Sequence, residues 1–269
     1  MSVKAQLIQT GDLGGPLNMA IDELLWVEAA RGPIYLRLYG WADRPALSLG
    51  YFQSAAEVRR DPRWSRLPYV RRITGGGTII HDQEVTYSLA LPSRIAPRTS
   101  ELYDRVHRSI AETLVESGIP AQVGASELAH DDAHSLCFHR SDRFAVRVHG
   151  VKVLGSAQRR RTDSVLVHGS LLLASSVVAP EIAGLREALG TEVGRELAER
   201  LMVRAMQSSL SLDLTPCKLV GELWDRAVQL ADEKYRSPRW NNLRQEVRTR
   251  TYSREVSPSE GVEAVKRGC

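Results

Sequence analysis

Apolar residues occupy every second position along much of the first two thirds of the chain, a pattern that is typical of β-strands. Ile34, Leu36 and Leu38 are one example. The strands predicted in this way cover residues 34–38, 46–51, 69–72, 78–80, 85–91, 119–123, 144–149, 152–158 and 165–173. The dipeptide His149-Gly150 predicts a turn that joins two of these strands in a hairpin.

Elsewhere apolar residues recur at steps of three and four, which predicts amphipathic helices. The predicted helices cover residues 17–31, 55–60, 101–117, 181–189, 195–210 and 218–235. The clearest is 101–117, with Ser100 as its predicted N-cap and Gly118 as the residue that ends it. Pro16 suits the first turn of the first helix, because the N–H that proline lacks has no helical partner there.

The order of these elements predicts the fold class. Strands gathered in the first two thirds, with helices set apart rather than strictly alternating, indicate an α+β fold with a mixed or antiparallel sheet flanked by helices. We expect one large domain over residues 1–236. Residues 237–269 are polar and rich in arginine, which predicts a C-terminal extension that is partly disordered.

Composition narrows the class of protein. The 269 residues are 43% hydrophobic and 25% charged, as in ordinary soluble proteins, and no apolar run is long enough to predict a membrane span. The N-terminus has no apolar signal region. Three well-separated cysteines, Cys137, Cys217 and Cys269, form no paired framework, and Cys217 is predicted to begin a helix. We therefore expect a cytoplasmic protein without a membrane partner.

The net charge of +4 is carried by short arginine clusters such as residues 159–161. A basic surface suits nucleic acid, and also an acidic protein partner such as an acyl carrier. The chain has no zinc finger, helix-turn-helix or aromatic-rich RNA-binding motif, so we expect no nucleic-acid partner. No spacing of histidine and cysteine resembles a metal site, so we expect no metal.

Residues 71–77, Arg-Arg-Ile-Thr-Gly-Gly-Gly, are the first candidate for chemistry. The consecutive glycines Gly75, Gly76 and Gly77 allow positive φ and present bare N–H groups to a ligand, and Arg72 suits a carboxylate or a phosphate. A flexible turn is the alternative, which the two arginines before the loop and a His-Asp pair after it disfavour. No Lys-Ser or Lys-Thr follows, so this is not a Walker loop.

Two histidines lie in predicted strands. His81-Asp82 suggests a base with an orienting carboxylate, but adjacent strand residues point to opposite faces, so we expect no direct pair. A catalytic and a pocket-lining role for His81 both remain open. His168-Gly169 places a polar residue in an apolar strand, where a satisfied core histidine is the preferred interpretation over a ligand contact.

Cys137 stands in a polar segment predicted as a loop, 15 residues before Lys152 on the predicted hairpin. A thiol needs a nearby cation to be ionised at neutral pH, and a lysine ammonium provides one. Acyl transfer through a thioester is the resulting hypothesis; a buried, inert cysteine and a solvated lysine are the alternatives. Gly155, Ser156 and Ala157 follow as a run of small residues that lets the backbone approach a ligand.

In this order along the chain, these motifs resemble the biotin/lipoate A/B protein ligase family, over roughly residues 17–235. Lipoate–protein ligases of the family activate free lipoate with ATP, whereas its cysteine-dependent octanoyltransferases carry the acyl group on a cysteine. Cys137, with its neighbours and its distance from Lys152, is similar to the second branch. So is the segment 81–88, His-Asp-Gln-Glu-Val-Thr-Tyr-Ser.

The resemblance implies the catalytic-domain fold of biotin and lipoate protein ligases for residues 1–236, a mixed sheet flanked by helices. It implies Cys137 and Lys152 as catalytic residues, with the lysine stabilising the thiolate. The substrate-binding residues that it implies are Arg72, Gly75, Gly76, Gly77, His81, Gly155, Ser156, Ala157, His168 and Gly169.

The activity implied is octanoyl transfer in lipoate biosynthesis. The group would pass from octanoyl-acyl carrier protein, through a Cys137 thioester, to a lysine of a lipoyl domain such as glycine cleavage H protein, with no cofactor. Three alternatives stay open: an ATP-dependent lipoate–protein ligase, a transferase acting between lipoyl domains, and a non-catalytic module that binds an acyl group or its carrier.

Overall fold

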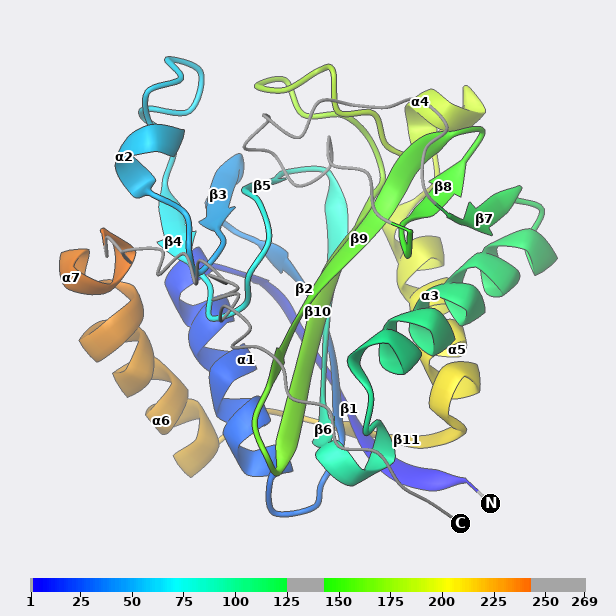
Figure 1. Ribbon diagram of the computed structural model, residues 1–269, viewed down its shortest axis with the longest axis horizontal. Helices are drawn as coiled ribbons and strands as arrows, with labels where there is room; N and C mark the ends of the chain where they lie inside the picture. The colour runs from blue at the N-terminus through cyan, green and yellow to red at the C-terminus, as the bar shows by residue number, and fades with distance from the viewer. Residues whose placement is uncertain (1, 125–142, 243–269) are drawn as a thin grey trace, which may run out of the picture.

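The computed structural model describes residues 2–124 and 143–242, and within them the chain forms one large and one small β-sheet (Figure 1). The large sheet has the strand order β11 (Leu212–Cys217), β1 (Val3–Leu13), β2 (Tyr35–Trp41), β6 (Glu84–Pro92), β10 (Ser164–Leu172), β9 (Val151–Arg160), β8 (Val146–Val148) and β7 (Ala121–Val123). The small sheet has the order β4 (Tyr69–Arg71), β3 (Ala46–Leu49) and β5 (Ile79–His81).

Both sheets are mixed. β1 runs parallel to β2 and β11, whereas the pairs from β2 to β7 are antiparallel. In the small sheet β3 is parallel to β4 and antiparallel to β5. The prediction of an α+β fold with a mixed sheet flanked by helices is therefore confirmed, as is the hairpin of β8 and β9, whose turn residues His149 and Gly150 both have positive φ.

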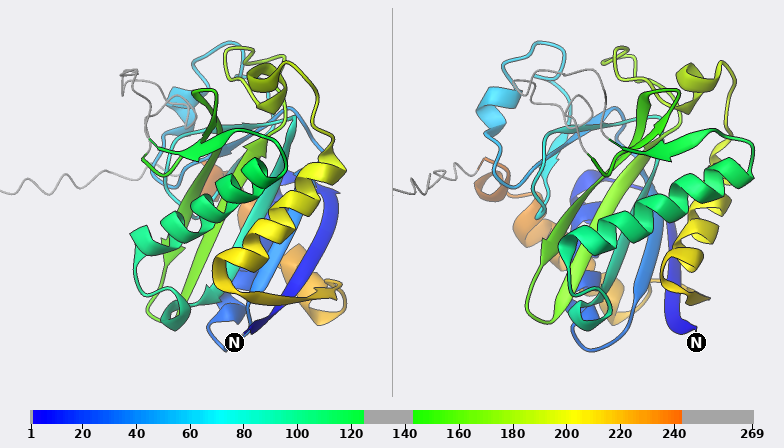
Figure 2. Two further views of the ribbon diagram at one scale, coloured as in Figure 1. Left: turned by 90° about the vertical axis from the view of Figure 1, so that its right-hand side faces the viewer. Right: turned by 45° about the vertical axis from the view of Figure 1, so that its right-hand side comes forward.

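Helices cover both faces of the large sheet (Figures 1 and 2). α1 (Gly15–Ala29) and α6 (Glu222–Leu230) cover one face, and α3 (Thr99–Glu116) and α5 (Arg195–Leu210) lie side by side on the other. The remaining helical segments are short: α2 (Ala55–Val58), α4 (Leu185–Leu189), α7 (Pro238–Asn241), a 3₁₀ turn (Ser93–Ile95) and a π turn after α6 (Ala231–Tyr235). None of the helices described is long and apolar enough to cross a lipid bilayer.

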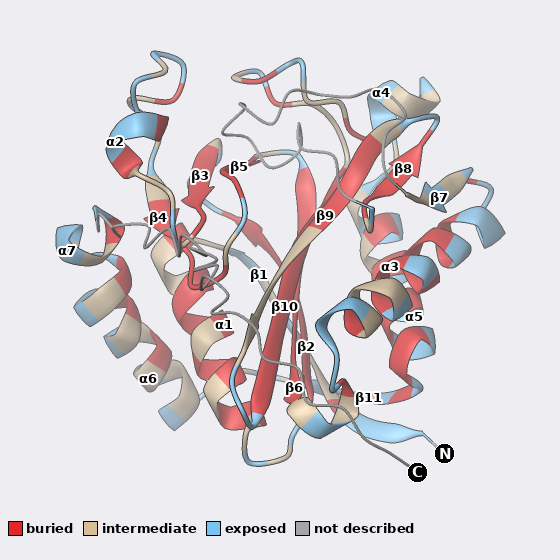
Figure 3. Cartoon of the chain, viewed as in Figure 1, coloured by how far each residue is buried: buried red, intermediate tan, exposed pale blue. Residues whose placement is uncertain are grey.

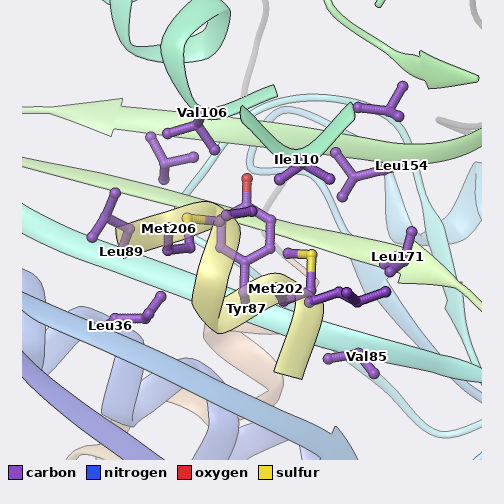
Figure 4. Packing of buried hydrophobic residues seen from close by; sticks show 14 of the residues in the cluster. Leu36, Val85, Tyr87, Leu89, Val106, Ile110, Leu154, Leu171, Met202 and Met206 are labelled. Atoms are coloured by element: carbon purple, nitrogen blue, oxygen red, sulfur yellow. The ribbon is translucent and has the colours of Figure 1, made fainter. Parts of the chain in front are cut away.

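The central strands are buried along their whole length (Figure 3). On the α3/α5 face β6 contributes Val85, Tyr87 and Leu89 to the largest apolar cluster, which α5 completes with Met202 and Met206 (Figure 4). Each fully buried side chain of this size stabilises the fold by roughly 1.5–3 kcal/mol relative to exposure. Packing in this cluster holds β6, β10 and β9 in fixed positions.

The apolar pattern does not predict β1 and β11, which lie together at one end of the large sheet. Ala5 and Ile8 are the buried residues of β1, and Leu212 is that of β11. Strands with so few buried residues have no strict two-residue apolar period, which explains the omission. Cys217 ends β11, and α6 begins only at Glu222, so the prediction that Cys217 begins a helix is wrong.

The start of α3 also differs from the prediction. The helix begins at Thr99, and Arg98, with extended φ and ψ, is the N-cap without a side-chain hydrogen bond. Ser100 already lies within the first turn, so its prediction as the N-cap is wrong. Gly118 follows the helix end with a φ of +84°, and its prediction as the residue that ends the helix is confirmed.

Candidate active site

The glycine loop, residues 72–78, connects β4 to β5, and Arg72 lies inside it. The buried guanidinium donates to the carbonyls of Gly75 (2.8 Å), Gly77 (2.7 Å) and Ser48 (2.8 Å), to the Ser48 hydroxyl (3.2 Å) and to Thr74 Oγ1 (3.1 Å). In a trans peptide the N–H points away from the preceding carbonyl. The N–H groups of Gly76 and of residue 78 therefore face away from Arg72.

The loop is held by a second backbone segment, residues 50–53. A Cβ atom on Gly50 would lie 1.9 Å from the carbonyl oxygen of Gly76, so only glycine allows the two backbones to approach this closely. Gly76 itself has a φ of +93°, which also favours glycine. The positive φ predicted for the glycines is thus found at Gly76. Neighbouring groups hold the loop in place around it.

A buried polar network supports the loop from α1. Asp22 Oδ2 lies 3.1 Å from His168 Nδ1, and His168 Nε2 lies 2.6 Å from Thr74 Oγ1. A carboxylate only accepts, so Nδ1 donates to Asp22 and the neutral ring accepts the Thr74 hydroxyl at Nε2. Asp22 also accepts from three further donors, Arg37 (2.9 Å), Tyr39 (2.8 Å) and Ser88 (2.7 Å).

The charges of this network follow from its contacts. Burial by itself raises the pKa of Asp22, but the hydrogen bond from His168 and the charge of Arg37 outweigh it, so the pKa lies below its usual value. Burial lowers the pKa of His168, and its interactions with Asp22 only partly oppose this. An ionised Asp22 therefore holds a neutral His168. Both ring nitrogens of His168 have protein partners, as the interpretation of a satisfied core histidine predicts.

His81 is oriented by Glu84, not by Asp82. Its Nδ1 is hydrogen-bonded to Glu84 Oε1, its Nε2 lies 2.7 Å from Ser48 Oγ, and its ring stacks on Trp41 with centroids 3.7 Å apart. Asp82 instead accepts from a serine hydroxyl, Ser176 Oγ, at 2.7 Å. The prediction that His81 and Asp82 form no direct pair is confirmed. The two-residue connection from β5 to β6 brings the buried His81 and Glu84 together.

Lys152 lies on β9 at an irregularity of the strand pairing. Leu154 pairs with Val146, but Lys152 pairs with Arg147, so β9 has one extra residue, Val153. The Lys152 side chain is 6% exposed, and its Cε lies 3.1 Å from the position of a Cβ on Gly155. The lysine stem therefore covers Gly155.

The small residues after Lys152 divide between the two faces of the sheet. Gly155 pairs with Ser170 and Ala157 with His168, so these residues share the face of the glycine loop. Ser156 pairs with Gly169, and its hydroxyl points to the α3 side. There it lies 2.6 Å from the Tyr87 hydroxyl and 2.7 Å from His107 Nε2.

Gly169 makes room for that serine. A Cβ on Gly169 would lie 2.4 Å from Ser156 Oγ. The Ser156 side chain thus belongs to the far face, away from the glycine loop, and Gly169 meets the site only through its backbone. The other predicted substrate-binding residues, Arg72, the three glycines of the loop, His81, Gly155, Ala157 and His168, lie on the near side, and their contact with substrate stays a prediction.

A small cavity lies between β6, β10, the small sheet and α1. Its volume is about 10 Å³, and its lining includes Met19, Trp41, Ile79, Thr86 and Ser170 beside Arg72, His81 and His168. Ser170 Oγ, in this lining, has no hydrogen-bond partner in the described residues, nor has Oε2 of Glu84, the carboxylate that His81 contacts. The site thus combines apolar walls with polar groups that are free to accept or donate.

Two predicted features lie outside the described residues, Cys137 and residues 243–269 of the C-terminal extension. The thioester site therefore stays a prediction. Within the described ranges, no three histidine, cysteine, aspartate or glutamate side chains gather as metal ligands.

Asp22 and Glu84 are site residues that were not predicted. Asn18 and Asp22 are both buried on α1, four residues apart, and such a polar pair on the apolar face of a helix is the signal that points to Asp22.

Comparison with known proteins agrees with this fold. The family described as "Lipoyl protein ligase A/B catalytic domain" matches residues 15–200. The chain therefore belongs to the lipoyl protein ligase A/B catalytic domain family, as the motifs predict.

Among its relatives, Octanoyltransferase LipM of Symbiobacterium thermophilum is 35% identical over 90% of this chain and 99% of that protein. Octanoyltransferase LipM of Bacillus subtilis is 29% identical over 89% and 98%. These relatives confirm the predicted enzyme class, an acyltransferase.

Solved structures support the fold. Lipoate-protein ligase A bound with ATP aligns with a TM-score of 0.73 at 20% identity, covering 89% of this chain and 98% of that one. A bi-partite lipoate protein ligase from Thermoplasma acidophilum, studied with its E2 lipoyl domain, aligns with a TM-score of 0.71 at 21% identity, covering 91% and 99%. At this identity the likeness establishes the catalytic-domain fold alone.

Proposed function

We propose that this acyltransferase moves an octanoyl group from octanoyl-acyl carrier protein to a lysine of a lipoyl domain, such as glycine cleavage H protein, through a thioester on Cys137. Similarity to octanoyltransferases over nearly their whole length supports the choice of octanoyl. The observation that carries the mechanism is Lys152, which is buried against Gly155 on the sheet face of the glycine loop. From that face its ammonium can stabilise a thiolate.

In the first half-reaction the Cys137 thiolate attacks the carbonyl carbon of the donor thioester. A new C–S bond forms, the bond to the carrier thiol breaks, and the carrier leaves as a thiolate that takes up the proton of the Lys152 ammonium. One thioester replaces another, so the step needs no ATP. The Lys152 ammonium stabilises the attacking thiolate.

In the second half-reaction the ε-amine of the acceptor lysine attacks the same carbonyl carbon. A C–N bond forms, the bond to Cys137 breaks, and the amine proton passes to Lys152 or to the departing thiolate. The N–H groups of Gly76 and Thr78, which face away from Arg72, are the donors for the oxyanion of each tetrahedral intermediate. The apolar walls of the cavity receive the acyl chain, and they must move apart to admit it, because its present volume suits about one water molecule.

The decisive experiment is the intact mass of the protein after incubation with octanoyl-acyl carrier protein in the absence of ATP. The wild type should gain one octanoyl group that hydroxylamine removes, and Cys137→Ser should gain none. Addition of a lipoyl domain should then discharge the wild-type acyl-enzyme and give an octanoylated domain.

Two outcomes contradict the proposal. An undiminished rate of transfer in Cys137→Ser removes the thioester step. A wild type that gains no mass, but releases AMP when given free lipoate and ATP, is a lipoate–protein ligase.

A further inference from the structure

Arg71, the residue before the glycine loop, has its guanidinium buried among backbone carbonyls. The side chain is 0% exposed, and Nη1 donates to the carbonyls of Gly50 (2.9 Å), Tyr51 (3.0 Å) and Gln53 (2.7 Å). Burial lowers its pKa below the usual value. A guanidinium withdrawn from water in this way requires its acceptors to be held firmly in place.

Helix α7 contacts Arg71 from the other side. Nε and Nη2 of Arg71 donate to the carbonyls of Trp240 (3.2 Å) and Asn241 (2.9 Å). In return, the Trp240 indole donates to the Arg71 carbonyl at 2.8 Å, and Asn241 Oδ1 accepts the Arg71 backbone N–H at 2.7 Å. The Asn241 amide also donates to the carbonyl of Tyr235 at 2.7 Å, which ties α7 to the end of the preceding helical segment.

The segment that Arg71 holds, residues 50–53, is the one that shapes the glycine loop. The Tyr51 N–H donates to the Thr74 carbonyl at 2.8 Å, and the Thr78 hydroxyl donates to Gln53 Oε1 at 3.1 Å. Between these two contacts Gly50 lies against the Gly76 carbonyl. A continuous series of hydrogen bonds therefore leads from α7, through Arg71, to both ends of the loop.

We propose that Trp240 and Asn241 are positioning residues of this enzyme, which fix the conformation of the glycine loop through Arg71. Residues 237–242 then belong to the catalytic unit and not to a separate C-terminal extension. The inference rests on the proposed function only for its effect on octanoyl transfer, because the effect on loop conformation is measurable without any substrate.

Two adjacent asparagines provide a matched test. Asn241→Ala removes the side-chain contacts with the Arg71 N–H and with the carbonyls of Tyr235 and Ser237. Asn242→Ala removes a single exposed contact, in which the Tyr69 hydroxyl donates to Asn242 Oδ1 at 2.6 Å. Hydrogen exchange of the backbone amides of residues 73–78 should be at least about fivefold faster in Asn241→Ala and unchanged in Asn242→Ala. Trp240→Phe, which keeps the ring but loses the indole donor, should show a smaller increase.

Kinetics of the folded variants give the second measurement. Acylation of Cys137 by octanoyl-acyl carrier protein should slow about fivefold or more in Asn241→Ala, while alkylation of Cys137 by iodoacetamide keeps the wild-type rate, because that reagent does not use the loop. Equal loop exchange and equal acylation rates in Asn241→Ala, Trp240→Phe and Asn242→Ala would overturn the inference. A wild type that is never acylated would instead overturn the proposed function, and the exchange measurement would still decide the role of α7.

Discussion

Around β6, the two faces of the central sheet differ in how they bury side chains. Strand β6 shows both, since its alternate residues point to opposite sides. Toward α3 and α5 it presents Val85, Tyr87 and Leu89 to an apolar cluster, and toward α1 it presents Thr86 and Ser88 to polar partners. An apolar cluster is stabilised by volume and shape, whereas a buried polar network is stable only when every partner is present.

The polar face is therefore the one that specifies the site. On this face Asp22, Arg37 and His168 hold the glycine loop in one arrangement, and removal of one member leaves another unpaired. The apolar face supports the fold. Substitutions on it are expected to change the free energy of unfolding more than the rate of octanoyl transfer. Four predictions test this division.

The largest effect is expected for Asp22→Ala. The substitution leaves the buried Arg37 without its counterion, which should lower the free energy of unfolding by roughly 3–5 kcal/mol. Octanoyl transfer per folded molecule should fall as well, because His168 and Thr74 lose their support. Denaturant unfolding and transfer assays measure the two effects.

Leu89→Ala is the matched change on the apolar face. It should lower the free energy of unfolding by about 3 kcal/mol through the cavity it leaves, with little effect on transfer per folded molecule. Similar activity losses in Asp22→Ala and Leu89→Ala would show that the two faces contribute alike.

The pH dependence of stability gives an intermediate effect. His168 and Asp22 both have pKa values lowered by folding, so the unfolded chain binds more protons than the folded chain in acid. Stability is therefore expected to fall as the pH falls, for His168 from its ordinary value of 6.5 downward and for Asp22 from 3.8 downward. Each group contributes a slope of up to about 1.4 kcal/mol per pH unit.

The variant His168→Gln isolates the contribution of His168 to the pH dependence, because the other histidines contribute equally to the variant and the wild type. Unfolding of the wild type below pH 6.5 should show the steeper loss of stability. Parallel stability curves for the two proteins would contradict the charge state assigned to the network.

The smallest effect is expected for Ser156→Ala. Its hydroxyl bonds Tyr87 and His107 on the α3 face, so the substitution should lower the free energy of unfolding by about 1 kcal/mol. Because the side chain points away from the glycine loop, octanoyl transfer should stay within about twofold of the wild type. A large loss of activity without a loss of stability would place Ser156 in the reaction after all.

The sequence predicts the regular elements well and the polar contacts poorly, for a physical reason. Apolar periodicity reports which side of an element is buried, so α1, β6 and the β8–β9 hairpin follow from it. It does not report partners that are distant in sequence, and Asp22 and His168 are 146 residues apart. The orienting carboxylate of His81 was similarly not identified, because a two-residue turn places Glu84, rather than the adjacent Asp82, against the ring.

The run of small residues after Lys152 illustrates the same limit. Gly155, Ser156 and Ala157 form one motif in the sequence, but strand geometry sends Ser156 to the opposite face from its neighbours. The bulge at Val153 also shifts the pairing of β9 with β8 by one residue, which apolar periodicity does not predict. The run of small residues shows where a ligand can approach the backbone. The strand register determines which side chains of the run lie on the face of the glycine loop.

The glycine loop acquires its supports late in protein synthesis. Arg71 and Arg72 emerge from the ribosome early, but the loop bonds His168 from a strand made some ninety residues later, and Asn241 bonds Arg71 across a separation of 170 residues. A nascent chain therefore carries an unsupported loop and two arginines that have yet to meet all their acceptors. The site is assembled only when nearly all of the described chain has been translated, so a chain cut short before α7 would lack the last of these supports.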